Sequence, residues 1–263
     1  MRRRTDVTWR IGTIGFSYSP WRGVFYPPGS KPNEYLAYYA SRFDSVELDT
    51  TFHAMPTLER VRAWAEQVDE QFRFVVKTPK MITHEGPIEQ RVDLMRAFAD
   101  VVRGFEQKLG MVLLQFPPTF EPRETSSLMK MLDRVRDVPL AVEFRNNAWF
   151  AQGTVRLFDE RGVTVVANDY LDQTQPLISR QPMFLRFIGE HDRFSKYDEE
   201  ELDMTERLQW WIDQVEKRAA PNATVYAMFN NDYAGYSVGT GDRLKDLLSL
   251  AKKRTDAMVS LFE

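Results

Sequence analysis

The 263-residue sequence lacks cysteine, long apolar runs and a strong net charge. Without cysteine, disulfides and thiolate chemistry are excluded, and a zinc site would lack its commonest ligand. No run approaches the roughly 18 apolar residues of a membrane span, and none follows the basic start Arg2–Arg4 as it would in a signal peptide. The formal charge of −3 indicates neither nucleic acid nor an anionic membrane as partner. We therefore expect a cytoplasmic protein and leave its oligomeric state open.

Short strand patterns recur along the chain, with helical patterns between most of them. The predicted strands are 9–15, 45–50, 72–77, 111–116, 140–145, 163–168, 183–187 and 224–229. The predicted helices are 34–41, 58–68, 88–109, 126–135, 155–161, 205–217 and 243–253. Thr57 is expected to cap one helix, and Gly110 to end the long one.

This alternation predicts parallel strands with right-handed crossovers. Eight such strands favour an α/β fold consisting of a single (β/α)8 TIM-barrel-like domain over residues 1–263. An open doubly wound sheet is the alternative, but no glycine-rich fingerprint follows the first strand. The longest connections, 16–33, 78–87, 170–182, 189–204 and 230–242, follow the carboxyl ends of strands, so we expect long loops at that mouth.

The predicted strands end in polar or charged residues. Side chains alternate between the two faces of a strand, so Glu143 and Arg145 share a face opposite Val142 and Phe144. In parallel sheets, buried on both faces, charge belongs near the carboxyl ends, where barrels hold their catalytic groups. The same arrangement is expected of an ion-pair network that only closes the barrel, in which carboxylates neutralise lysine and arginine. We favour the functional interpretation.

Candidate catalytic residues are Glu47, Lys77, His84 and Glu143. Two carboxylates suit acid/base work, a lysine at an inner strand end can serve as a base with a lowered pKa, and His84 can carry a proton near neutral pH. Candidate substrate-binding residues are Ser17, Trp21, Gln115, Arg145, Trp149, Arg186, Asn230 and Asn231. Guanidinium groups grip phosphate or carboxylate at two points, and glycine-containing loops after a last barrel strand often hold phosphate.

A divalent metal is a further alternative, with Glu47, Glu143 and Asp169 as its only candidate ligands. No two of the three histidines, His53, His84 and His191, have metal-ligand spacing. No cofactor is therefore assigned with certainty.

The chain also resembles the YecE-like proteins, the family called domain of unknown function 72. The resemblance rests on short motifs in order along the chain: Ile14–Tyr18, Trp21, Gly23, Phe25–Pro27, Val46-Glu47, Thr51-Phe52, Lys77, Thr83-His84, Leu114–Pro118, Glu143–Arg145, Trp149, Arg186, Gly189 and Phe229–Asn231. It implies a TIM-barrel-like fold with these strand ends gathered at one mouth, and it supplies no reaction. His53 stands where the family usually has tyrosine, and Ile188 where histidine is common.

These observations lead us to predict an enzyme that applies general acid/base chemistry to a small, polar, anionic metabolite, such as a sugar phosphate or a nucleotide-derived fragment. Hydrolase, lyase and isomerase activities all remain open. Two other functions also remain open. One is hydrolysis of a glycosidic bond by Glu47 and Glu143, and the other is a non-catalytic barrel that binds or senses a small ligand.

Overall fold

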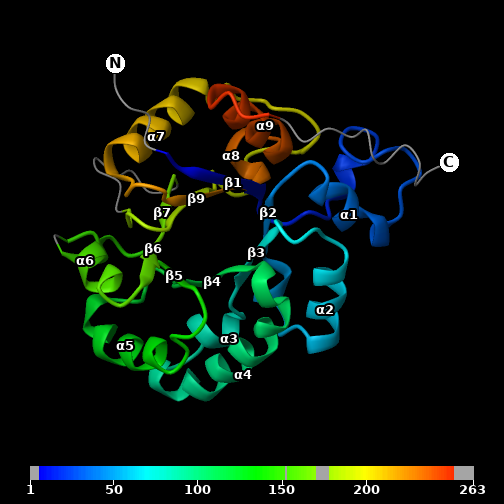
Figure 1. Cartoon of the computed structure of the whole chain (residues 1–263). Helices are drawn as coiled ribbons and strands as arrows, with labels where there is room; N and C mark the ends of the chain where they lie inside the picture. Colours follow the sequence, from blue (N-terminus) through cyan, green and yellow to red (C-terminus); the bar gives the residue numbers. More distant parts are fainter. Residues whose placement is uncertain (1–5, 152, 170–177, 252–263) are drawn as a thin grey trace.

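The computed structural model describes residues 6–151, 153–169 and 178–251, and shows an α/β, TIM-barrel-like fold. The strands surround the centre of the molecule and helices lie outside them (Figure 1). The strands are β1 (Thr8–Thr13), β2 (Ser45–Leu48), β3 (Arg73–Lys77), β4 (Leu109–Gln115), β5 (Leu140–Glu143), β6 (Val163–Val165), β7 (Ala167–Asn168), β8 (Met183–Phe187) and β9 (Thr224–Phe229). The α/β class and the TIM-barrel-like arrangement predicted from the sequence are confirmed.

All strand pairs are parallel and form two sheets, in the orders β2-β3-β4-β5-β6 and β1-β9-β8-β7. A parallel bridge between Ile14 and Glu47 connects β1 to β2. There the Gly15 amide donates to the Glu47 carbonyl oxygen over 2.8 Å. On the other side, the predicted strand 163–168 is interrupted at Val166 and becomes β6 and β7. The two sheets lie around the centre of the molecule, an arrangement called here the ring of strands. The carboxyl ends of all these strands therefore lie at the same end of the ring.

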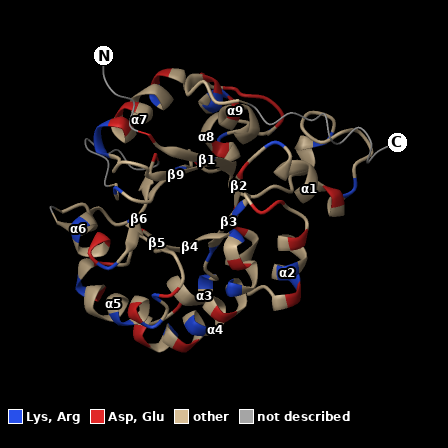
Figure 2. Cartoon of the chain, in the orientation of Figure 1, with Lys and Arg blue, Asp and Glu red and all other residues tan. Residues whose placement is uncertain are grey.

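The helices pack their apolar stripes against the outside of the strands. They are α1 (Tyr35–Ala40), α2 (Leu58–Glu66), α3 (Lys80–Thr83), α4 (Val92–Val102), α5 (Thr125–Asp133), α6 (Thr154–Asp159), α7 (Thr205–Arg218), α8 (Asn231–Ala234) and α9 (Ser237–Leu247). Thr57 caps α2 as predicted, because its hydroxyl accepts from the Arg60 amide. Acidic and basic residues are spread along these outer helices (Figure 2).

Buried side chains form two separate clusters. The larger one joins strands to helices, whereas the smaller one lies among strand and strand-end residues alone. Its members are Ile14, Val75, Met111, Leu113, Ala141, Val166, Phe184, Tyr226 and Met228. Because no helix contributes to it, this smaller cluster is the inner apolar core of the ring, and it defines which side of each strand faces inward.

Two predicted boundaries are wrong. The helix expected over 88–109 is a short 3-10 turn (Ile88–Arg91), then α4, then a 3-10 segment (Arg103–Lys108) broken at Glu106, whose φ is 51°. Gly110 does not end that helix, because it already lies within β4. The expected loop 230–242 is largely helical, since α8 and the first turns of α9 lie within it.

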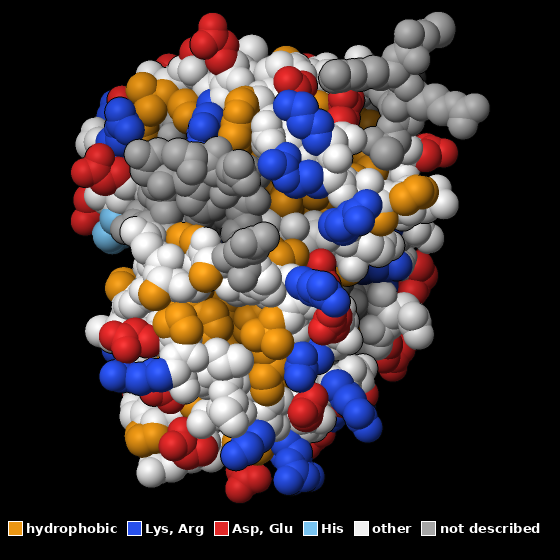
Figure 3. Space-filling model, turned by 90° about the vertical axis from the view of Figure 1, so that its left-hand side faces the viewer, with side chains coloured by type: hydrophobic (Ala, Val, Ile, Leu, Met, Phe, Trp, Pro, Cys, Tyr) orange, Lys and Arg blue, Asp and Glu red, His pale blue; other side chains and the backbone are white. Residues whose placement is uncertain are grey.

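The outer surface shows mixed character on the face turned toward the viewer in Figure 3. Hydrophobic side chains gather near the middle of this face, and basic and acidic side chains lie interspersed around them. In the described part of the chain, no helix has the length and apolar character required to cross a bilayer. Of the expected long loop 170–182, residues 170–177 lie outside the described residues.

Candidate functional site at the carboxyl ends of the strands

A layer of polar side chains lies directly above the inner apolar core. The strand register and the two-residue alternation place these side chains on the inward face: Glu47, Lys77, Gln115, Glu143, Asn168 and Arg186. Lys77, for example, lies two residues beyond the inward-facing Val75, and Arg186 two beyond Phe184. Charged side chains in such a position lie at the mouth of a barrel, where a ligand can reach them.

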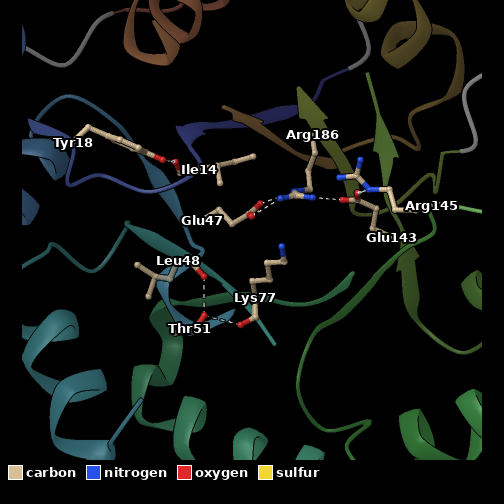
Figure 4. A network of polar contacts seen from close by, with 9 residues as sticks. All are labelled: Ile14, Tyr18, Glu47, Leu48, Thr51, Lys77, Glu143, Arg145 and Arg186. Atoms are coloured by element: carbon tan, nitrogen blue, oxygen red, sulfur yellow. Dashed lines mark hydrogen bonds and ion pairs between the residues drawn. The ribbon is translucent and has the colours of Figure 1, made fainter. Parts of the chain in front are cut away.

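Arg186 joins two of the predicted catalytic carboxylates. Its Nε and Nη2 atoms donate to the two carboxylate oxygens of Glu47 over 2.8 and 2.7 Å, and its Nη1 donates to Glu143. The side chains of both glutamates are fully buried, and that of Arg186 is 4 % exposed. Figure 4 shows the guanidinium lying between the two carboxylates. Arg186 therefore binds protein carboxylates, and at least three of its five N–H donors are already engaged.

Arg145 extends this network toward solvent. Its Nε lies 2.5 Å from the second oxygen of Glu143, and its side chain is 12 % exposed. Because Glu143 ends β5 and Arg145 lies two residues further on, their side chains project to the same side, as the sequence predicts. Of the two arginines expected to grip an anion, Arg145 is the one that solvent reaches more readily.

Lys77 points its ammonium group toward the space between Glu47 and Glu143 (Figure 4). Among the described residues it forms no ion pair with either carboxylate; its Nζ lies 4.0 Å from the ring centroid of Phe52. The hydroxyl oxygen of Thr51 lies 2.6 Å from the Lys77 carbonyl oxygen and 2.8 Å from that of Leu48, so its single proton is shared between them and links the ends of β3 and β2. The hydrogen bond to Thr51 thus positions the backbone of Lys77, and the positive charge of its ammonium group lies over the face of the Phe52 ring.

The surroundings separate the proton affinities of these groups. Burial raises the pKa of Glu47, against the attraction of Arg186. Burial also acts on Glu143, but Arg145, Arg186 and Lys77 outweigh it and hold the pKa of Glu143 below its ordinary value. Burial, reinforced by the nearby guanidinium of Arg186, lowers the pKa of Lys77 to about 8. Paired groups whose pKa values are pushed apart are typical of acid/base sites.

His84 lies at the edge of this cluster. It is half-buried in the loop after α3, its Nδ1 is 2.8 Å from the Thr83 hydroxyl, and its ring centroid is 5.1 Å from that of Phe52. Burial, followed by the charges of Lys77 and Lys80, lowers the pKa of His84. The histidine also lines a hollow of about 460 Å3 between the loops that follow β3 and β4. Phe52 thus contacts both His84 and Lys77.

Both tryptophans predicted to bind substrate are buried in aromatic packing. Trp21 is fully buried and contacts Phe25 edge to face, with ring centroids 5.6 Å apart. Trp149 is 2 % exposed, stacks on Phe144 at 4.0 Å, and donates its indole N–H to the Phe120 carbonyl oxygen. The structure therefore places neither ring on an open surface. Ser17, in contrast, is exposed.

The amide candidates and Asp169 have partners within the protein. Gln115 donates to the Phe116 carbonyl oxygen, and Asn230 accepts from the Asp232 amide at the start of α8. Asn231 is buried and accepts from the amide and the hydroxyl of Ser237. Asp169 is paired with Arg207 and accepts from the Tyr233 hydroxyl, which separates it from the Glu47–Arg186–Glu143 bridge.

The ion pairs described above involve all three residues that the sequence suggests as metal ligands. Among residues 6–151, 153–169 and 178–251, no cluster of three or more His, Asp or Glu side chains is arranged to hold a metal ion. The three candidate ligands are instead bound to arginines: Glu47 and Glu143 to Arg186, and Asp169 to Arg207.

Asn168 is a candidate that the sequence reasoning did not select. It lies two residues beyond the inward-facing Val166, is the register partner of Arg186, and is 2 % exposed. Neither its amide nitrogen nor its amide oxygen has a hydrogen-bond partner among the described residues. A buried amide that forms no hydrogen bond destabilises the folded protein, and such groups in native structures often have a functional role. The feature of the sequence that could have identified Asn168 is its position as a polar residue at the end of a predicted strand.

The two departures from the family pattern have different surroundings. His53 is exposed just after the 3-10 turn Thr50–Phe52, with its ring 5.5 Å from that of Phe52. Ile188 is partly buried and packs against the inner apolar core, where a histidine would place a polar ring.

Fold and site together define an α/β, TIM-barrel-like protein with an ion-paired polar layer at the carboxyl ends of its strands. The chain belongs to the family described as "Protein of unknown function DUF72", whose model matches residues 10–260. It is 25 % identical to the UPF0759 protein YunF of Bacillus subtilis, over 86 % of this chain and 90 % of that one. It is 35 % identical to the UPF0759 protein YecE of Escherichia coli K12, over 49 % of this chain and 47 % of that one.

Solved structures agree with this assignment. A DUF72 family protein from Thermotoga maritima is 28 % identical, with a TM-score of 0.74 over 92 % of this chain and 99 % of that one. A DUF72 family protein from Enterococcus faecalis, 24 % identical, has a TM-score of 0.72 over 93 % and 98 % of the two chains and shows the same fold. The predicted membership of the YecE-like family is confirmed.

Proposed function

We propose that this protein is an enzyme that applies general acid/base chemistry to a small, polar, anionic metabolite at the carboxyl ends of β2, β3, β5 and β8. One observation carries the proposal. Three cationic side chains, Lys77, Arg145 and Arg186, lie near two carboxylates, and within the described part of the chain Lys77 forms no ion pair with either of them. Such an arrangement carries excess positive charge and therefore favours an anion.

The arrangement also distributes the chemical roles. Arg186 orders the carboxylates, so contact with the anion falls to Arg145 and Lys77. Glu143, with its lowered pKa, is the ionised carboxylate and the candidate base. Lys77, with a pKa of about 8, can take up or release a proton near neutral pH. His84 is a second proton carrier, one aromatic contact away through Phe52.

Hydrolysis of a glycosidic bond is disfavoured by the same bridge. A glycosidase needs space between its two carboxyl groups for the sugar and, in inverting enzymes, for a water molecule. Here the guanidinium of Arg186 is hydrogen-bonded to Glu47 and Glu143 at once. The space between the carboxylates is therefore filled by protein.

A non-catalytic barrel that binds a small anion is the second candidate function. The observation in its favour is that both carboxylates are fully buried and already bound to Arg186, as expected of groups that stabilise a positively charged binding site. Anion binding without turnover distinguishes this candidate from the enzyme.

Binding of inorganic phosphate and of a panel of sugar phosphates tests the anion assignment by calorimetry. We expect Arg145→Met to weaken binding about tenfold or more, a loss of roughly 1.4 kcal/mol. Arg156→Met is the matched control, because Arg156 is 84 % exposed on α6, where it pairs with Glu160 and lies outside the polar layer. Equal affinities in the wild type, Arg145→Met and Lys77→Met would contradict the assignment.

Proton transfer is tested with the same panel in deuterated water. An enzyme that removes a proton next to a carbonyl exchanges that hydrogen for deuterium, and NMR follows the loss of the signal. We expect exchange in at least one carbonyl-containing member with the wild type and none with Glu143→Gln. Binding without exchange or conversion of any member would instead support the non-catalytic barrel.

A further inference from the structure

The amine of Lys77 can act as a base or as a nucleophile toward a carbonyl carbon. It extends from the end of β3 toward the bridge formed by Glu47, Arg186 and Glu143, as Figure 4 shows. The carboxylates that would neutralise an ordinary lysine are bound to arginines, and the ammonium lies over the Phe52 ring at 4.0 Å. A lysine beside other cations and away from bulk water has an amine suited to nucleophilic attack.

We propose that Lys77 is a covalent catalytic residue whose Nζ condenses with the carbonyl carbon of an anionic aldehyde or ketone. This inference rests on the proposed function and names the substrate class for the same site. The anionic group of the substrate would be held on the side of Arg145, which is the more exposed arginine of the network.

The condensation needs no oxidant, reductant or cofactor. Nζ first releases a proton to solvent and attacks the carbonyl carbon, so that a carbon–nitrogen bond forms and the carbonyl electron pair moves to oxygen. That oxygen takes up the proton released to solvent and one from the attached nitrogen, and leaves as water while the nitrogen lone pair forms the carbon–nitrogen double bond. One ammonium and one carbonyl thus give one protonated imine and one water, with the same total charge.

The environment that accepts the ammonium also accepts the protonated imine. Both are cations at the same position, so the Phe52 face and the nearby carboxylates stabilise either one. A protonated imine withdraws electrons from the neighbouring carbon and makes its hydrogen easier to remove. Glu143 would then be the base that removes it, which connects the covalent step to the acid/base role proposed above. A pKa of about 8 leaves part of the Lys77 population neutral at mildly alkaline pH.

The test is reductive trapping. The full chain is incubated at pH 8 with glyoxylate, a small anionic aldehyde, or with pyridoxal 5′-phosphate, a larger one, and reduced with borohydride. Hydride adds to the imine carbon and makes the adduct permanent, so peptide mass spectrometry can locate it. We expect one dominant adduct, on Lys77, formed more slowly when inorganic phosphate is present in excess.

Lys80 is the internal reference, because it lies three residues further on and is exposed. Lys80→Arg should leave the adduct on Lys77 unchanged. Lys77→Arg should abolish the dominant adduct and retain the fold, which circular dichroism and thermal unfolding check. Lys77→Met provides a second variant without an amine in case the arginine does not fit.

The outcomes separate this inference from the proposed function. Phosphate binding and deuterium exchange without an adduct on Lys77, with both aldehydes, would overturn the inference and leave the proposed function standing. Adducts that are no more abundant on Lys77 than on Lys80 would also overturn it. An adduct on Lys77 that phosphate does not slow, together with no phosphate binding, would support the nucleophile and contradict the anion-binding function.

Discussion

Two buried asparagines of this protein show how the same side chain can either stabilise the fold or weaken it. Asn168 and Asn231 are 2 % and 1 % exposed. The oxygen of Asn231 accepts two hydrogen bonds from Ser237 and only its amide nitrogen is without a partner, whereas neither amide atom of Asn168 has a partner among the described residues. The two asparagines are almost equally buried, so their expected contributions to stability differ because of their hydrogen bonds.

Replacement of each asparagine by leucine, which has a similar volume, should therefore change stability in opposite directions. We expect Asn168→Leu to raise the free energy of unfolding by about 1 kcal/mol and Asn231→Leu to lower it by about 1–3 kcal/mol. Urea denaturation measures both. If Asn168 contacts the ligand, Asn168→Leu also loses phosphate affinity. A loss of stability in Asn168→Leu as large as that in Asn231→Leu would show that Asn168 has a structural partner.

Lys77 should make the stability of the protein depend on pH. Its pKa is about 8 in the folded chain and about 10.4 in an unfolded one. Below pH 8 both states carry the ammonium, and the folded state bears its burial cost. Between pH 8 and about 10.4 the folded state releases the proton first, so the contribution of Lys77 to stability rises with pH in that window.

Lys77→Met lacks this ionisation, so its advantage in stability over the wild type should be largest at pH 7 and should shrink toward pH 10. Lys77→Arg stays charged, and should fall further behind the wild type over the same range. Denaturant unfolding at pH 7, 8, 9 and 10 gives the differences. A constant difference between the wild type and Lys77→Met would mean that Lys77 titrates alike in both states.

At the scale of elements, the contact between the end of β8 and α8 depends on Gly189. This glycine has a φ of +74°, and a Cβ built on it would lie 2.0 Å from the Asp232 carbonyl oxygen of α8. Gly162, between α6 and β6, has a similar φ of +69° and nothing within 4 Å of the same position. The two glycines thus share backbone strain and differ only in the space around them.

Alanine substitution separates those two effects. Gly162→Ala should cost about 1–2 kcal/mol, the strain of a left-handed residue with a Cβ. Gly189→Ala should cost a further 1–3 kcal/mol or so, because α8 must move. Urea midpoints compare them. If the two variants lost the same stability, α8 would be able to move away from the strand ends without cost. Its position would then not constrain the site.

The sequence predicted where most elements lie but not how the helix after β3 ends. Residues 88–109 have a helical apolar pattern almost throughout, yet the α-helix ends at Val102. Phe105 is buried against Phe74 of β3, with ring centroids 4.4 Å apart, and Glu106 adopts a positive φ. Packing against the sheet thus overrides helix propensity here, and periodicity does not contain that information.

At the scale of the whole molecule, Arg186 connects the two sheets. It extends from β8 in one sheet and binds Glu47 of β2 and Glu143 of β5 in the other. Loss of one partner of such a buried bridge leaves a charge without compensation, which makes the three residues interdependent. The polar layer therefore belongs to the assembled ring and to no single element.

Local patterns in the sequence were sufficient to determine the α/β alternation, the parallel strands and the polar strand ends. The physical reason is that side-chain alternation and helix periodicity are properties of neighbouring residues. Alternation also placed Glu143 and Arg145 on one face before any contact was known.

Only the tertiary structure decided which charges neutralise each other. It paired Arg186 with Glu47 and Glu143, placed Lys77 over Phe52, and enclosed Trp21 and Trp149 in aromatic packing. These outcomes depend on distances between residues far apart in the chain and on the low dielectric inside the ring, where a pairing that would count for little in water fixes the geometry. The order of the residues along the chain specifies neither quantity directly.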